Sequence, residues 1–284
     1  MESNIIINTD VVQMSASAIV IAVSCHGIFD LNSDTPTESD TLPKGVAFSF
    51  IKAIQAINEK LAAKNSHDPL FDLILVANDL QGNQSKVVSS TKHYGLQISR
   101  FCFCTSEDFT QSLQATNVNL YLSMETSDVG KALQEGVPAA LLCPQTRPQL
   151  EGDEEQVASP LTVLLSGDVM GLPEEKLLEA GFSQPQLQIF RAAKASMADF
   201  AAVIGEMRRH FGREDSPLRV TLMSVLGSRD EWASALLTAR GWGLEVDEAY
   251  CLAGASREPV LKCIQPHILC YDGLYNVTEV PALS

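Results

Sequence analysis

The sequence lacks three features that mark common classes of protein. No stretch reaches the 18 or more consecutive apolar residues of a membrane-spanning helix, and Met1–Asn4 carries no basic residue of the kind that opens a signal peptide. Basic residues are scarce, with 20 Lys and Arg against 35 Asp and Glu, a net charge of −15. Because nucleic-acid binding relies on surplus positive charge, we expect neither a nucleic-acid nor a membrane partner. A small anionic ligand stays open, because local amides and one or two cations are enough to bind it.

Two further motifs are missing. There is no G-x-G-x-x-G and no P-loop. The seven cysteines form no C-x-x-C pair, and four of them lie in apolar segments: Cys102, Cys104, Cys251 and Cys270. We interpret them as reduced core thiols, not metal ligands, and therefore expect a cytoplasmic protein.

What the sequence does contain is a regular alternation of apolar strands and amphipathic helices. Strands are predicted at 18–23, 71–76, 97–104, 119–124, 138–143, 161–165, 218–225, 247–252 and 267–271. Most are separated by helical patterns, as at 46–61, 84–93 and 230–240. Strands alternating with helices predict an α/β fold with a parallel, doubly wound sheet.

The chain divides near its middle. Residues 144–160 are rich in Pro, Gln and Glu and are the best linker candidate. We therefore predict an N-terminal α/β lobe at 1–150 and a C-terminal α/β lobe at 151–284 with a helical insert around 172–216. Segments of the two halves correspond at an offset of 148 residues, as Gly95 does to Gly243, and either duplication or convergent patterning explains this.

One strand ends in chemically suggestive residues. Leu161–Leu165 is apolar apart from Thr162, as expected of a strand buried on both faces, and Ser166-Gly167-Asp168 follows it. Ligands of open α/β sheets bind beyond the carboxyl ends of such strands. The sequence therefore favours a site at Ser166–Asp168, although a serine in a plain turn and an aspartate capping the next helix explain the same residues.

Several segments, in the same order over residues 18–277, resemble the type I cytosolic 5′-nucleotidases, a branch of the haloacid-dehalogenase-type phosphohydrolases. They are 21–24 with 29–30, 48–53, 93–102, 116–123, 242–249, 252–255 and 266–268. The resemblance implies a phosphatase-like C-terminal lobe and Mg²⁺-dependent hydrolysis of nucleoside 5′-monophosphates of the AMP or IMP type. It also implies an aspartyl-phosphate intermediate, in which a carboxylate nucleophile divides one displacement into two steps.

The residues at the motif positions depart from the family pattern. The family's Asp-Gly-Asp falls on Ser166-Gly167-Asp168, so that serine stands at the nucleophile position and Asp168 at the acid/base position. The phosphate-binding hydroxyl falls on Ser224, the phosphate-binding Lys on Arg257, and the Asp-Asp of the metal motif on Tyr271-Asp272.

The resemblance thus gives a set of expected site residues. Ser166 and Asp168 are the catalytic candidates; Ser224, Arg257 and Gly167 are the phosphate-binding candidates; Asp272 and Asp168 are the metal candidates. Loss of a nucleophile lowers a rate by roughly 10⁶-fold, and Mg²⁺ is either held weakly or lost. The sequence leaves two functions open: an impaired 5′-nucleotidase, or a catalytically silent nucleotide-binding or regulatory protein. An oligomer is compatible with either.

Overall fold

The structure is a computed structural model that describes residues 4–11, 18–31, 41–64, 71–78, 80, 82–143, 160–209, 216 and 218–274. The chain forms two compact units, Met1–Val137 and Pro138–Ser284. The linker predicted at 144–160 lies outside the described residues except for Pro160.

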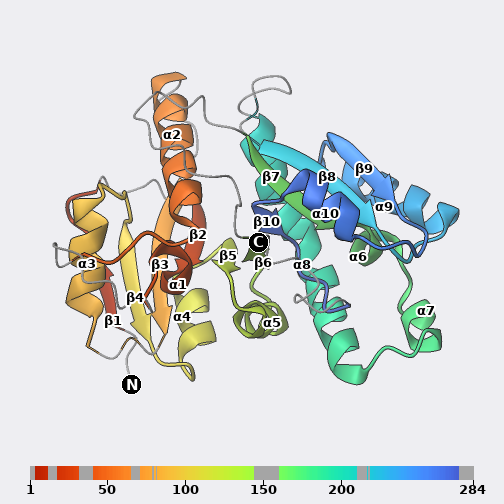
Figure 1. Ribbon diagram of the computed structural model, residues 1–284, viewed down its shortest axis with the longest axis horizontal. Coiled ribbons are helices and arrows are strands. Elements are labelled where there is room, and N and C mark those ends of the chain that lie inside the picture. Colours follow the sequence, from red (N-terminus) through yellow and green to blue (C-terminus); the bar gives the residue numbers. More distant parts are fainter. Residues whose placement is uncertain are drawn as a thin grey trace. The chain divides into compact units, whose positions relative to one another are not determined.

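The N-terminal unit is a mostly parallel sheet with helices between its strands (Figure 1). The strand order is β1-β4-β3-β2-β5; β1 pairs antiparallel with β4, and the other pairs are parallel. Its elements are β1 (Asn4–Ile7), β2 (Ile19–Ser24), α1 (Cys25–Ile28), α2 (Phe48–Lys64), β3 (Phe71–Asn78), α3 (Gln84–His93), β4 (Arg100–Cys104), α4 (Phe109–Ala115), β5 (Leu120–Ser123) and α5 (Thr126–Gln134).

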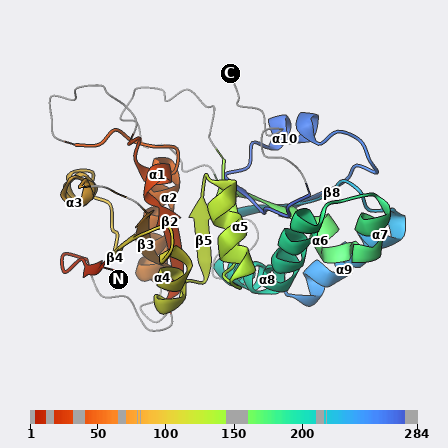
Figure 2. The same ribbon diagram turned by 90° about the horizontal axis from the view of Figure 1, so that it is seen from below.

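The C-terminal unit is also built on parallel strands. The order is β6-β10-β7-β8-β9, and only β6, which pairs with β10, runs antiparallel. Its elements are β6 (Ala139–Leu142), β7 (Leu161–Ser166), α6 (Gly167–Gly171), α7 (Glu174–Glu179), α8 (Gln184–Arg209), β8 (Leu218–Ser224), α9 (Arg229–Gly241), β9 (Glu248–Cys251), α10 (Glu258–Ile264) and β10 (Ile268–Leu269). Figure 2 shows α6, α8 and α9 on one side of these strands and α10 on the other.

The predicted α/β class, with parallel strands and helices between them, is confirmed. Burial agrees with this class, because every residue of β7 is buried, as the apolar run in the sequence predicts. The apolar side chains of α8 form its buried face, with Leu187, Phe190, Met197 and Phe200 each no more than 2% exposed.

The two units share a strand order. In the N-terminal unit β2 is central, β3 and β4 follow on one side, and β5 lies on the other. In the C-terminal unit β7, β8, β9 and β10 take the same places. The offset of 148 residues between Gly95 and Gly243 carries β3, β4 and β5 onto β8, β9 and β10.

The cysteine prediction is correct in part. All seven cysteines are free thiols, and Cys102 and Cys270 are buried. Cys251 is exposed, because β9 forms an edge of its sheet and alternate side chains of this strand face outward. Cys104, the last residue of β4, is half-buried.

Candidate functional site

The six expected site residues all lie in the C-terminal unit. Ser166 ends β7, Ser224 ends β8, and Asp272 follows β10. Because β10, β7 and β8 are neighbouring parallel strands, their carboxyl ends meet at one edge of the sheet. Residues separated by about 100 positions in sequence are therefore brought together there.

Asp168, in the short helix α6, is held by donors from the end of β8. The Ser224 hydroxyl donates to Oδ1 over 2.6 Å, and the Val225 N–H donates to Oδ2 over 2.8 Å. The Gly227 N–H donates to Oδ1 over 3.1 Å, and the Leu226 N–H lies 3.2 Å from both oxygens. With four donors around a carboxylate that is 1% exposed, Asp168 binds the β8–α9 turn to the start of α6.

Ser166 forms a second buried pair. Its hydroxyl donates to Oδ2 of Asp272 over 2.9 Å, and it accepts the N–H of Val169 over 3.4 Å as the N-cap of α6. The other Asp272 oxygen, Oδ1, accepts the N–H of Leu274 over 3.0 Å. The serine at the nucleophile position is thus within hydrogen-bond distance of a carboxylate.

Burial governs the charge of Asp272. Removal from water raises the pKa of Asp272, and the neighbouring charge of Asp168 raises it further. The hydrogen bonds from Leu274 and Ser166 and the positive charge of Arg257 oppose that rise without cancelling it. The ionised form of Asp272 is therefore disfavoured at this site.

Arg257 completes the cluster. It precedes α10 as its N-cap residue and lines a small cavity together with Ser166, Asp168 and Asp272. The cavity measures about 20 Å³, which is room for about one water molecule. A nucleotide therefore requires this edge of the sheet to open.

Gly167 has a packing role in this cluster. A Cβ atom there would lie 3.2 Å from both the Ser224 Cβ atom and the Trp232 ring, and 3.3 Å from the Met223 carbonyl oxygen. Glycine at this position thus lets α6 approach β8 and α9 closely.

The donor set does not suit a firmly held Mg²⁺ ion. Among the described residues no three His, Cys, Asp or Glu side chains gather as metal ligands. Both oxygens of Asp168 and both of Asp272 already accept hydrogen bonds within the protein. Because Mg²⁺ demands near-octahedral oxygen ligands, these carboxylates do not form a firm Mg²⁺ site.

The cluster contains groups that the sequence reasoning did not name. These are the backbone N–H groups of Val225, Leu226 and Gly227. Their only sequence signal is Gly227, where a Cβ atom would lie 2.6 Å from the Ser224 Oγ atom. Backbone donors are otherwise invisible in a residue pattern.

The fold and the position of the cluster define the class: an α/β protein whose polar side chains gather beyond the carboxyl ends of parallel strands, where ligands of such sheets bind. The model of the 5′-nucleotidase family matches residues 11–282. The chain therefore belongs to the 5′-nucleotidase family.

The chain is also similar to a human protein named cytosolic 5′-nucleotidase 1B. The two are 30% identical over 263 residues, a region that covers 87% of this chain and 42% of the relative. The chain thus spans less than half the length of that protein. Within the described residues, no helix has the length and apolarity needed to cross a membrane.

Proposed function

We propose that this chain binds a nucleoside 5′-monophosphate at the strand-end cluster and cleaves its phosphate ester slowly or not at all. Family membership and the name of the human relative support the nucleotide. The latter also supports a cytosolic location. The cavity is too small for a nucleotide as it stands, so binding includes a local opening at the strand ends.

The observation that carries the proposal is the pairing of Ser166 with Asp272. In a mechanism that uses a carboxylate nucleophile, serine at that position removes the group that takes the phosphoryl. The Ser166 hydroxyl instead donates a hydrogen bond to Asp272. Removing the nucleophile from such a catalytic unit lowers the rate by roughly 10⁶-fold, a barrier increase of about 8 kcal/mol.

A second function is favoured by the same hydrogen bond. A hydroxyl 2.9 Å from a carboxylate oxygen is the arrangement of a nucleophile beside a base. Ser166 Oγ would attack phosphorus and its proton would pass to Asp272. The bond to the nucleoside 5′ oxygen would break, and that oxygen would take the proton from Asp272, so that the products are the nucleoside and a phosphoserine. The phosphoserine formed is a stable ester, so a phosphorylated protein, not steady turnover, is the product of this alternative.

Phosphate release from AMP and IMP, with and without Mg²⁺, tests the proposal when wild type is compared with the double variant Ser166→Asp, Tyr271→Asp. We expect no release above blank from wild type and a gain of at least about tenfold over the assay background from the double variant. Wild-type turnover that Ser166→Ala leaves unchanged would contradict the role given to Ser166. A phosphoryl group on Ser166, detected by intact mass, would establish the second function.

A further inference from the structure

Helix α9 leaves one face uncovered. Leu237 is 68% exposed, the highest value for any large apolar side chain among the described residues. Asp230, Ala233 and Arg240 are exposed as well, and with Leu237 they recur at spacings of three and four residues, which places them on one side of the helix. Ala235, on the opposite side, is fully buried.

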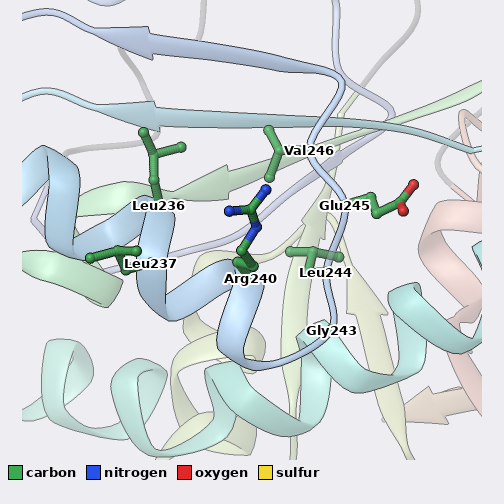
Figure 3. A pocket seen from close by; sticks show the side chains of 7 residues that line it. All are labelled: Leu236, Leu237, Arg240, Gly243, Leu244, Glu245 and Val246. Carbon is green, nitrogen blue, oxygen red and sulfur yellow. The ribbon is translucent and has the colours of Figure 1, made fainter.

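A surface hollow of about 640 Å³ adjoins this face. Leu236, Leu237 and Arg240 line it from α9, and 243–246 line it from the turn that leads to β9 (Figure 3). The hollow lies at the amino end of β9, whereas the Ser166 cluster follows the carboxyl ends of β7 and β8. It is therefore a different surface from the candidate functional site.

Arg240 stands in this hollow with no acidic partner of its own. Figure 3 shows its guanidinium group beside Leu236 and Val246, while the Glu245 carboxylate points away from it. Across the described parts of the chain, neither Arg240 nor Asp230 makes a side-chain ion pair. An exposed cation next to exposed leucines favours an occupant that is apolar and carries a carboxylate.

The exposed face of α9 itself has both of these features, an apolar surface and a carboxylate. Asp230 and Arg240 lie five residues before and after Ala235, and Ala233 and Leu237 lie two residues before and after it. Two copies of α9 can pack antiparallel about a two-fold axis that lies level with Ala235. Each residue of one helix then faces the residue of the partner helix that lies equally far on the other side of Ala235. Arg240 then meets the partner's Asp230, and Leu237 meets the partner's Ala233, each contact occurring twice.

We propose that α9 docks against α9 of a second copy of this chain in an antiparallel, two-fold symmetric contact. Charge complementarity points to a second copy, because the acid and the base that pair are present at matched positions on the same helix. The small side chain of Ala233 leaves room for Leu237. Antiparallel packing also sets the positive end of one helix dipole beside the negative end of the other.

The contact is small, since each copy contributes one helix of 13 residues and its neighbouring hollow. Interfaces of this size belong to weak complexes. Sedimentation of the full chain from about 1 to about 200 μM therefore covers the range in which dimers should form. A wild-type chain that remains monomeric over this whole range overturns the proposal.

Charge reversal tests the register. Asp230→Arg alone sets Arg against Arg240 at both contacts, and Arg240→Asp alone sets Asp against Asp230, so each variant should be monomeric. An equimolar mixture restores an opposite-charge pair at both contacts and should dimerise. A mixture that stays monomeric, or a single variant that dimerises as wild type does, overturns the antiparallel arrangement.

A substitution at the centre of the contact tests the surface without relying on charge. Leu237→Asp should weaken dimerisation at least about tenfold. The matched control is Leu178→Asp, because Leu178 is a leucine of α7 that is 49% exposed and lies outside α9. Equal effects of the two substitutions overturn the proposal, and far-ultraviolet circular dichroism verifies that each variant is folded.

Discussion

The Asp168 carboxylate is the most heavily hydrogen-bonded group of the candidate site. Its oxygens accept from the Ser224 hydroxyl and from three consecutive backbone N–H groups that follow β8. This buried carboxylate stabilises the fold, because removing it leaves several buried donors unsatisfied. Any loss of activity in an Asp168 variant must therefore be separated from loss of the fold.

Substitution of Asp168 should destabilise the C-terminal unit. Asp168→Ala is expected to lower the free energy of unfolding by about 3 kcal/mol or more, since the N–H groups of Val225, Leu226 and Gly227 lose their acceptor. Ser224→Ala removes one of the donors and should cost about 1 kcal/mol. Urea unfolding of both variants measures the two values, and an Asp168→Ala variant as stable as Ser224→Ala would contradict the structural role.

Asp272 predicts a pH dependence of stability. Burial raises its pKa, so Asp272 favours the folded state while protonated and loses that contribution as the pH rises through the raised value. Below the ordinary carboxyl pKa, about 3.9, Asp272→Asn should match wild type closely. Thermal unfolding from pH 4 to pH 8 should show the variant gaining stability relative to wild type.

The control for Asp272 is Asp199→Asn, which changes an exposed carboxylate of α8 in the same unit. Its difference from wild type should stay nearly constant over the same pH range. If the stability of wild type rose relative to that of Asp272→Asn as the pH increased, the ionised carboxylate would be stabilising, and the effect assigned to its burial would be wrong.

At the scale of elements, Glu231 joins two helices of the C-terminal unit. It lies in the first turn of α9, where its Oε2 atom accepts the N–H of Ser228 over 2.6 Å. It also pairs with Lys176 of α7. Together these contacts lower the pKa of Glu231 to about 2, and the contact with Lys176 has the largest effect.

Glu231→Gln should therefore destabilise the protein at neutral pH and less so in acid. A carboxyl with a lowered folded pKa stabilises the fold above its ordinary value of about 4.3, and that contribution is lost as the pH falls through about 2. Unfolding by urea at pH 7 and at pH 3 measures the change. Glu258→Gln, another first-turn glutamate that is exposed, should show no comparable trend.

The sequence predicts the long elements better than the short ones. Period and turn residues are enough for α3, whose predicted range 84–93 is the observed one, and for β7. Helix α6 was not predicted, because its five residues carry no period and form a helix only where Asp168 meets the β8–α9 turn. The edge position of β9, which exposes Cys251, likewise depends on tertiary pairing.

The site was predictable in its side chains and not in its surroundings. Resemblance named Ser166, Asp168, Ser224, Arg257 and Asp272, and the structure gathers them at the strand ends; their roles remain proposals. The pairing of Ser166 with Asp272 joins residues 106 positions apart. Neither that pairing nor the amide donors around Asp168 leaves a mark in local sequence.

At the scale of the whole molecule, both units repeat one arrangement of four parallel strands, yet only the C-terminal unit carries the cluster. Asn78 ends β3 at the place equivalent to the end of β8, and its amide donates to Asp128 over 3.4 Å. Asp79 lies outside the described residues. A shared strand order thus supports a repeat of architecture, whereas the proposed chemistry depends on side chains of one unit.

AMP binding by calorimetry, with phosphate release followed on the same sample, decides whether this chain holds a nucleotide without cleaving it rapidly. We predict heat of binding for AMP, little or none for adenosine, and no phosphate above the blank. Rapid phosphate release from wild type would contradict the account, because Ser166 would then sustain the chemistry that we infer it has lost. Absence of binding would equally contradict it, by removing the nucleotide from the site.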